Sequence, residues 1–164
     1  MIAIIAEKPS VGQEIARVVG ATEKKDGYIT GNGYMVTWAL GHLVSLALPG
    51  TYGYTRTTAE DLPMLPEPFR LVERQIRTDR GMVTDIAAGR QLKVIDGVFS
   101  ECDSIIVATD AGREGELIFR WIYSHLGCTK PFKRLWFSSL TDEAIRKGMA
   151  DLREGYEYDS LYAA

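Results

Sequence analysis

The stretch SIIVATDAGREGELIFRW, residues 104–121, limits the possible folds of this chain more than any other. Residues 105–108 are a short apolar run rich in β-branched side chains, which predicts a buried strand. Asp110, Arg113 and Glu114 follow this strand, where the chain passes into a predicted helix. The apolar stripe of that helix consists of Leu117, Ile118, Trp121 and Ile122. In an open α/β sheet, ligands bind where a strand passes into a helix, so this turn is the first candidate site.

The N-terminus has the same form. Residues 2–6 are a compact apolar run that predicts a second buried strand, of the parallel kind, and Glu7 and Lys8 follow at its carboxyl end. Ser10 and Gln13 have the spacing of a capping box at the start of a helix, and a glycine is placed to end that helix. If the two predicted strands lie near each other, their two charged turns share one crevice.

The middle of the chain predicts a hairpin followed by a loop. Residues 28–30 and 34–39 resemble short strands joined by Gly31-Asn32-Gly33, a hairpin signal. The stretch 49–69 is rich in Gly, Pro and Thr and predicts a long surface loop, of a kind that is often functional. Residues 69–76 then alternate like a strand. The side chains expected to point inward there are Phe69, Leu71 and Ile76.

The second half of the chain predicts two further helices and a strand around the opening stretch. Apolar residues that include Val83, Ile86 and Phe99 suggest a helical region before it, and residues 134–137 suggest a strand after it. Thr141 is expected to cap the last helix. The buried face of that helix is predicted to hold Ile145, Met149 and Leu152.

The length and the net charge of the chain limit the classes of function that it can have. A chain of 164 residues fits one domain, and no apolar run approaches the roughly 20 residues of a membrane span. The net charge of -3 argues against a module that coats DNA by itself, but it is compatible with a nucleic-acid enzyme whose acidic site is neutralised by a metal. Cys102 and Cys128 lack metal-ligand spacing, which favours reduced thiols in the cytosol.

Helical phase distinguishes the two glutamates of the opening stretch. Glu114 lies three and four residues before Leu117 and Ile118, so we expect it to begin the face that packs on the sheet. Glu116 is rotated by about 200° from it, at roughly 100° per residue, and is expected to point elsewhere. A carboxylate on the packed face needs a partner, which Arg113, Lys8, a bound cation or another group could supply.

The two turns together suggest a metal and phosphate site. Glu7, Asp110 and Glu114 offer hard oxygen ligands that suit Mg²⁺, and Lys8 and Arg113 offer positive charge to a phosphate. Such a set supports phosphoryl transfer, in which Lys8 could also protonate a leaving ribose oxygen. The alternative interpretation is structural. The acids would then form a helix cap or an ion pair, and the histidines, His42 and His125, are interpreted as structural or surface residues.

Five segments of the sequence resemble one family. These are IIAEKPS at the N-terminus, GHL at 41–43, ATDAGREGELIF at 108–119, RLWFSSLT at 134–141 and the terminal YDSLYAA. In this order they resemble the Toprim domain of type IA DNA topoisomerases, with the bacterial topoisomerase III subfamily most similar. The resemblance implies an α/β, Rossmann-like Toprim fold with a mainly parallel central sheet flanked by helices. It also implies Mg²⁺-dependent cleavage, passage and rejoining of single-stranded DNA in the bacterial cytoplasm, at the nucleoid.

The resemblance also implies roles for individual residues. Glu7 matches the glutamate placed beside the scissile phosphate, and Lys8 matches the lysine that contacts this phosphate. Asp110 and Glu114 match the first and last acids of the DxDxE motif, and Arg113 matches the arginine of the REGE segment. The second aspartate of the motif is replaced by a glycine at position 112, so we expect a single Mg²⁺ at Glu7 and Asp110, with Glu114 as a further candidate ligand.

The resemblance implies that only half of an active site lies in this sequence. The nucleophilic tyrosine of the family lies in a later domain, so we expect residues 1–155 to form the Toprim domain and 156–164 to begin the connection to the remaining topoisomerase domains. The chain alone is then expected to be inactive in DNA cleavage and relaxation. Two alternatives stay open: another Toprim enzyme, such as a primase-like polymerase or a nuclease, and a non-catalytic nucleotide-binding or scaffold domain whose acids are structural.

Overall fold

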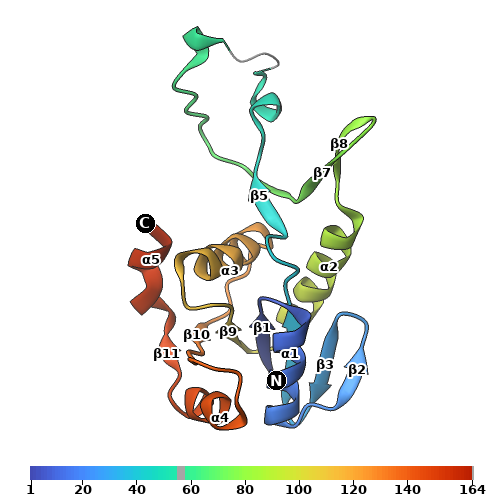
Figure 1. The fold of residues 1–164 in the computed structure, drawn as a ribbon, viewed down its shortest axis with the longest axis vertical. Coiled ribbons are helices and arrows are strands. Elements are labelled where there is room, and N and C mark those ends of the chain that lie inside the picture. Colours follow the sequence, from blue (N-terminus) through green and yellow to red (C-terminus); the bar gives the residue numbers. More distant parts are fainter. Residues whose placement is uncertain (55–57, 164) are drawn as a thin grey trace.

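A seven-stranded sheet forms the centre of the computed structural model, which describes residues 1–54 and 58–163 (Figure 1). Its strand order is β11-β10-β9-β1-β4-β3-β2, and β10, β9, β1 and β4 run parallel to one another. The parallel strands are β10 (Phe132–Arg134), β9 (Ser104–Ala108), β1 (Ile2–Ala6) and β4 (Tyr34–Trp38). The antiparallel edges are β11 (Arg153–Glu154), β3 (Tyr28–Gly31) and β2 (Glu23–Lys25). The predicted α/β fold with a mainly parallel sheet is confirmed.

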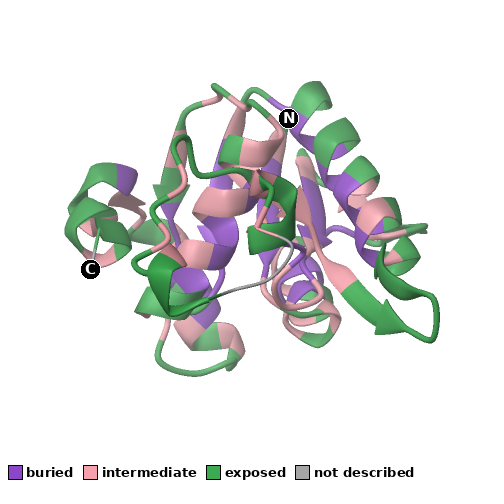
Figure 2. Cartoon of the chain, turned by 90° about the horizontal axis from the view of Figure 1, so that it is seen from above, coloured by how far each residue is buried: buried purple, intermediate pink, exposed green. Residues whose placement is uncertain are grey.

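Helices cover both faces of this sheet. They are α1 (Pro9–Val19), α2 (Ile86–Glu101), α3 (Arg113–His125) and α4 (Asp142–Ala150), followed by the short α5 (Asp159–Ala163). Successive side chains of a strand point to opposite faces, so Ile5 packs with α2 and α3, whereas Ile4 packs with α1 and α4. The buried residues therefore lie along the sheet and the inner sides of the helices, with exposed residues around them (Figure 2).

Helix boundaries agree with the sequence in two places and differ in one. Gly20 ends α1 with a φ of 82°, and the Thr141 hydroxyl accepts a hydrogen bond from the Ala144 N–H at the start of α4, as predicted. The predicted capping box of Ser10 is wrong. Helix α1 begins at Pro9, two residues before the start that a Ser10 cap implies. The fixed φ of Pro9 suits the first position of a helix, and its missing N–H needs no cap.

Between the predicted loop and α2, the structure differs more strongly from what the sequence predicts. Val83 lies in β8 (Gly81–Thr84), which pairs with β7 (Gln75–Thr78) as an exposed hairpin, and not in a helix. Helix α2 begins only after Asp85, whose carboxylate accepts the Ala87 N–H, and this leaves Ile86 86% exposed. The strand expected at 134–137 lies earlier, at β10. Of the three side chains expected to point inward from residues 69–76, only Leu71 is partly buried.

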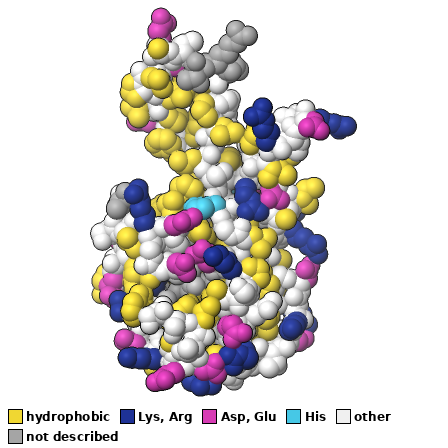
Figure 3. Space-filling view, viewed as in Figure 1, with side chains coloured by type: hydrophobic (Ala, Val, Ile, Leu, Met, Phe, Trp, Pro, Cys, Tyr) yellow, Lys and Arg dark blue, Asp and Glu magenta, His cyan; other side chains and the backbone are white. Residues whose placement is uncertain are grey.

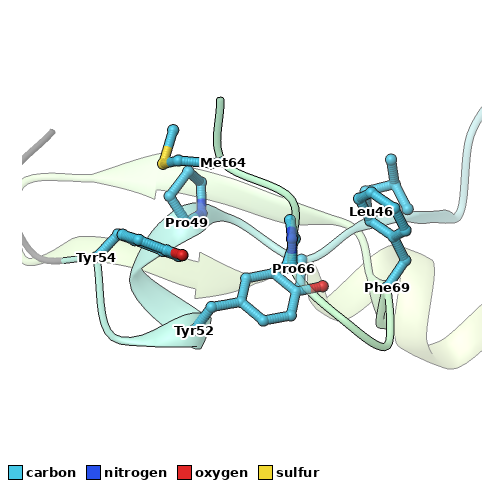
Figure 4. A pocket seen from close by; sticks show the side chains of 8 residues that line it. Leu46, Pro49, Tyr52, Tyr54, Met64, Pro66 and Phe69 are labelled. Atoms are coloured by element: carbon cyan, nitrogen blue, oxygen red, sulfur yellow. The ribbon is translucent and has the colours of Figure 1, made fainter. Parts of the chain in front are cut away.

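The predicted surface loop is a projection beyond the sheet (Figure 1). Strands β5 (Val44–Leu46) and β6 (Leu71–Glu73) pair at its base, and it contains the short 3-10 helices η1 (Pro49–Tyr52) and η2 (Ala59–Asp61). Its side chains surround a small hollow of about 180 Å³, seen in Figure 4. The hollow is lined by Leu46, Ala47, Pro49, Tyr52, Tyr54, Met64, Pro66 and Phe69, none of which is a predicted site residue.

Two further expectations concern the membrane and the thiols. Within residues 1–54 and 58–163, no helix has the length and apolar character needed to cross a membrane. Cys102 is buried and Cys128 is half-buried, and the two are not joined by a disulfide.

Candidate metal and phosphate site

The two predicted turns lie side by side because their strands are neighbours. Strand β1 pairs with β9 in parallel, with Ala6 opposite Ala108, so both strands deliver their next residues to the same edge of the sheet. There the main-chain N–H of Asp110 donates a hydrogen bond to Oε2 of Glu7, at 3.2 Å. Glu7 is half-buried and the Asp110 side chain is exposed. The structure therefore brings together the two acids predicted from separate parts of the sequence.

The two predicted basic residues lie at the first turns of the helices that follow. Lys8 is the residue before α1, in extended conformation, and Arg113 is the first residue of α3. Both side chains are exposed, and neither takes part in an ion pair within the described part of the chain. They are accessible to an anionic ligand.

The predicted position of Glu114 is wrong. Its side chain is 80% exposed and does not begin the packed face of α3. Its Oε1 lies 3.6 Å from Nε2 of His42, whose ring packs at 5.8 Å from that of Trp121. In the space-filling view, acidic side chains gather around a histidine on this face (Figure 3). His42 thus packs against α3, and Glu114 points toward it.

The glutamate on the packed face of α3 is Glu116, which the helical-phase argument had directed elsewhere. Glu116 is fully buried, as are Ile118, Phe119 and Ile122. The buried face is therefore shifted around the helix from the predicted stripe, and Leu117 is only partly buried. If Leu117 lay near the centre of this face, Glu114 would be the glutamate that packs on the sheet. Because Leu117 lies at its margin, the buried glutamate is Glu116.

Two arginines accompany this buried carboxylate. Oε1 of Glu116 accepts a hydrogen bond of 2.8 Å from Nε of Arg120, and Oε2 lies 3.1 Å from Nε of Arg134. Arg134 is fully buried, and burial lowers its pKa while the charge of Glu116 opposes that effect. Arg120 stands four residues after Glu116, a spacing that could have suggested their contact from sequence. No local signal indicates Arg134, which comes from β10.

The acids fit a metal ion only in part. Glu7 and Asp110 offer hard oxygen atoms at an open edge of the sheet, as Mg²⁺ requires. Within the described ranges, however, no three side chains of the His, Cys, Asp or Glu type are gathered closely enough to hold an ion. These two turns therefore offer two carboxylates to an ion, and water and phosphate oxygen atoms would have to supply its other ligands.

Comparison with known proteins identifies the family to which this chain belongs. The Toprim domain family matches residues 2–140, and the chain belongs to this family. Among the relatives is DNA topoisomerase 3 of Bacillus thuringiensis (strain Al Hakam), which is 48% identical over 166 aligned residues, covering 98% of this chain and 21% of that protein. DNA topoisomerase 3 of Bacillus subtilis (strain 168) is 46% identical over 163 residues, covering 97% of this chain and 21% of the relative.

The relatives are much longer than this chain, which spans about a fifth of their length. A solved structure gives the same proportion. Full-length topoisomerase I from Thermotoga maritima superposes with a TM-score of 0.57 and 20% sequence identity, covering 93% of this chain and 21% of the other. At this identity the similarity supports the fold. The resemblance inferred from the motifs is therefore confirmed at the level of the family.

Proposed function

We propose that this chain supplies the metal- and phosphate-binding half of a type IA DNA topoisomerase active site. The observation that carries this proposal is the hydrogen bond from the Asp110 N–H to the Glu7 carboxylate, at the edge where β1 and β9 end. It joins the two acids that match the family motifs, in a chain that is 48% identical to proteins named DNA topoisomerase 3. In the longer protein the activity is Mg²⁺-dependent cleavage, passage and rejoining of single-stranded DNA.

Each residue has a proposed role. Glu7 and Asp110 would hold one Mg²⁺, and Glu114, whose Oε1 lies 3.6 Å from Nε2 of His42, is a further candidate ligand. A bound metal would neutralise charge on the phosphate oxygen atoms, and metal binding is general to Toprim domains of topoisomerases. Lys8 and Arg113, both exposed, bind the scissile phosphate and stabilise the charge that develops on it.

The proposal places the remaining parts of the reaction outside this chain. The tyrosine nucleophile and the other topoisomerase domains belong to the longer protein, which acts on DNA in the bacterial cytoplasm, at the nucleoid. We propose that residues 1–155 form the Toprim domain and that 156–164 begin the connection. A supercoiled-DNA relaxation assay on the 164-residue chain is expected to show no activity, and robust relaxation would instead place a nucleophile within it.

A magnesium titration tests the metal site directly. Isothermal calorimetry on the 164-residue chain should show one Mg²⁺ bound, and Glu7→Ala and Asp110→Ala should each weaken binding by at least about ten-fold. Glu101→Ala, which removes an exposed carboxylate at the end of α2, is the matched control and should leave the affinity unchanged. Unchanged affinity in both site variants would show that these acids are structural.

A further inference from the structure

A fully buried ion pair lies beneath the turn that carries Asp110. Glu116 on α3 and Arg134 on β10 have no exposed surface, and Nε of Arg134 lies 3.1 Å from Oε2 of Glu116. These two atoms attract each other as ions, but they do not have the geometry of a hydrogen bond. Removing two charges from water is costly, and an apolar pair of similar volume is often at least as stable. Stabilisation of the fold alone therefore does not explain why a buried ion pair occupies this place, and the contacts of the pair suggest another role.

The guanidinium of Arg134 holds the end of β9. One terminal nitrogen donates to the Thr109 hydroxyl at 3.0 Å, and the other donates to the main-chain oxygen of Asp110 at 2.6 Å. A planar arginine fork fixes the direction of both bonds at once, which a lysine cannot do. Arg134 thus determines where the peptide group of Asp110 lies.

Glu116 in turn fixes the orientation of Arg134. Its second oxygen is held by Arg120, which also donates to the main-chain oxygen of Gly155 at 3.0 Å and to Asp159 at 2.6 Å. The carboxylate is therefore clamped between two arginines and has little freedom to move. Deleting its charge would leave the buried Arg134 cation without the acidic partner that lies against it.

A third set of contacts closes the turn from the helix side. The Thr109 hydroxyl donates to the main-chain oxygen of Gly115 at 2.8 Å, and Gly115 packs directly on the backbone of Asp110. Asp110 is thereby held at its carbonyl by Arg134 and at its N–H by Glu7, at 3.2 Å. The position of Asp110 relative to Glu7 depends on both bonds.

We propose that Glu116 and Arg134 are positioning residues that hold the Asp110 turn against Glu7 and so preset the spacing of the two carboxylates for a divalent cation. This inference rests on the proposed function. It adds that the buried pair, although it contacts neither metal nor phosphate, sets the affinity of the site. Groups that orient metal ligands in this way commonly change affinity by about 10- to 100-fold when they are removed.

Two readouts on the 164-residue chain test the proposal. Glu116→Gln keeps the shape of the side chain and removes its charge. We expect hydrogen exchange of the Asp110 amide to accelerate by at least about ten-fold in the metal-free chain, through local opening of the turn. We also expect Mg²⁺ affinity, measured by calorimetry at a temperature where the variant is folded, to fall by about ten-fold or more.

A control and a second variant separate positioning from general destabilisation. Asp85→Asn weakens the partly buried pair of Arg74 and Asp85 at the start of α2, so it should lower the melting temperature while leaving the Asp110 exchange rate and the Mg²⁺ affinity unchanged. If Glu116→Gln does not fold, Thr109→Val replaces it, because it removes the hydroxyl between Arg134 and Gly115 with little change of volume.

The outcomes are distinct. Faster exchange and weaker binding in Glu116→Gln or Thr109→Val, but not in Asp85→Asn, support the positioning role. Unchanged exchange and affinity in a folded variant overturn it, and the proposed function survives if Asp110→Ala still weakens Mg²⁺ binding by at least about ten-fold. If Asp110→Ala leaves binding unchanged, both the site and the positioning role are wrong.

Discussion

Gly115 lies so close to Asp110 that a β-carbon at position 115 would sit 2.1 Å from the main-chain oxygen of Asp110 and 2.8 Å from its nitrogen. No real side chain tolerates such a contact with backbone. The first turn of α3 and the turn after β9 can therefore be in contact only because residue 115 is glycine. The same close approach brings the Gly115 carbonyl to the Thr109 hydroxyl.

Replacing this glycine should separate the two turns. Gly115→Ala is expected to lower the free energy of unfolding by about 2 kcal/mol or more, because the added methyl group forces the backbone apart. It should also weaken Mg²⁺ binding, since Asp110 moves. Denaturant unfolding and calorimetry measure the two effects. Gly112→Ala is the control, since a β-carbon there meets nothing within 4 Å, and a loss of stability in this control equal to that of Gly115→Ala would contradict the explanation.

The glycine that departs from the family motif offers a gain of function. A side chain at position 112 enters open space, and the backbone there is extended, with a φ of -128°. Gly112→Asp should therefore be tolerated and should tighten Mg²⁺ binding by about ten-fold, because affinity rises with the number of charged ligands.

The matching control for that substitution is Gly112→Asn. Asparagine caps the start of α3 as well as aspartate does, but it brings no charge. Both variants should therefore gain thermal stability, and only the aspartate should gain metal affinity. Equal metal affinities for the two variants would indicate that position 112 does not face the ion.

The parts of the fold that were predictable are those with a strong local signal. The buried runs at β1 and β9, the hairpin of β3 and β4, the end of α1 at Gly20 and the cap at Thr141 all follow from short-range chemistry. The hairpin of β7 and β8 was missed because its apolar residues Met82 and Val83 are exposed, and apolar side chains on a surface imitate the beginning of an amphipathic helix.

The candidate site was predictable only as far as its two turns. Glu7 and Asp110 follow from the strands that precede them, whereas the choice between Glu114 and Glu116 depended on which face of α3 meets the sheet. Spacing from Leu117 and Ile118 favours Glu114, but the buried face is centred on Ile118, Phe119 and Ile122 and includes Glu116 instead. Arg134 arrives from another strand and compensates the buried carboxylate, and such a long-range partner leaves no pattern near Glu116.

Lowering the pH should remove the stabilisation that the ion pair between Arg74 and Asp85 gives to the start of α2. Hydrogen bonds from Arg74 hold the pKa of Asp85 below its usual range. A group with a lowered folded-state pKa stabilises the fold fully above its unfolded-state pKa, near 3.9, and this stabilisation is lost as the pH falls through the folded-state pKa. The difference in melting temperature between the wild type and Asp85→Asn should therefore be constant above about pH 5 and shrink below about pH 4.

Asparagine suits this test because it preserves the cap. Asp85 also accepts the Ala87 N–H at the start of α2, and an asparagine at this position does so equally well. The variant therefore reports on the ion pair with Arg74 alone. Arg74→Gln should remove the same pH dependence from the other side. A melting-temperature difference that grows on acidification would contradict the assigned direction of the shift.

A variant of Lys8 can show whether this residue stabilises the transition state of cleavage or only helps to bind DNA. It is exposed at the first turn of α1, next to Glu7, and forms no ion pair with the described residues that would compete with a phosphate. In the longer topoisomerase that we propose, Lys8→Ala should slow strand cleavage by about 100-fold, the size typical of losing a charge that stabilises the transition state. DNA binding should weaken only a few-fold, because one phosphate contact among many is lost.

The comparison requires cleavage and binding to be measured on the same single-stranded oligonucleotide at one salt concentration. Lys24→Ala, which removes an exposed charge from β2, is the control and should change neither quantity by more than about two-fold. Equal losses of cleavage and binding in Lys8→Ala would make this lysine a phosphate anchor. A selective loss of cleavage would instead show that its charge acts on the phosphate in the transition state, beside the carboxylates of Glu7 and Asp110.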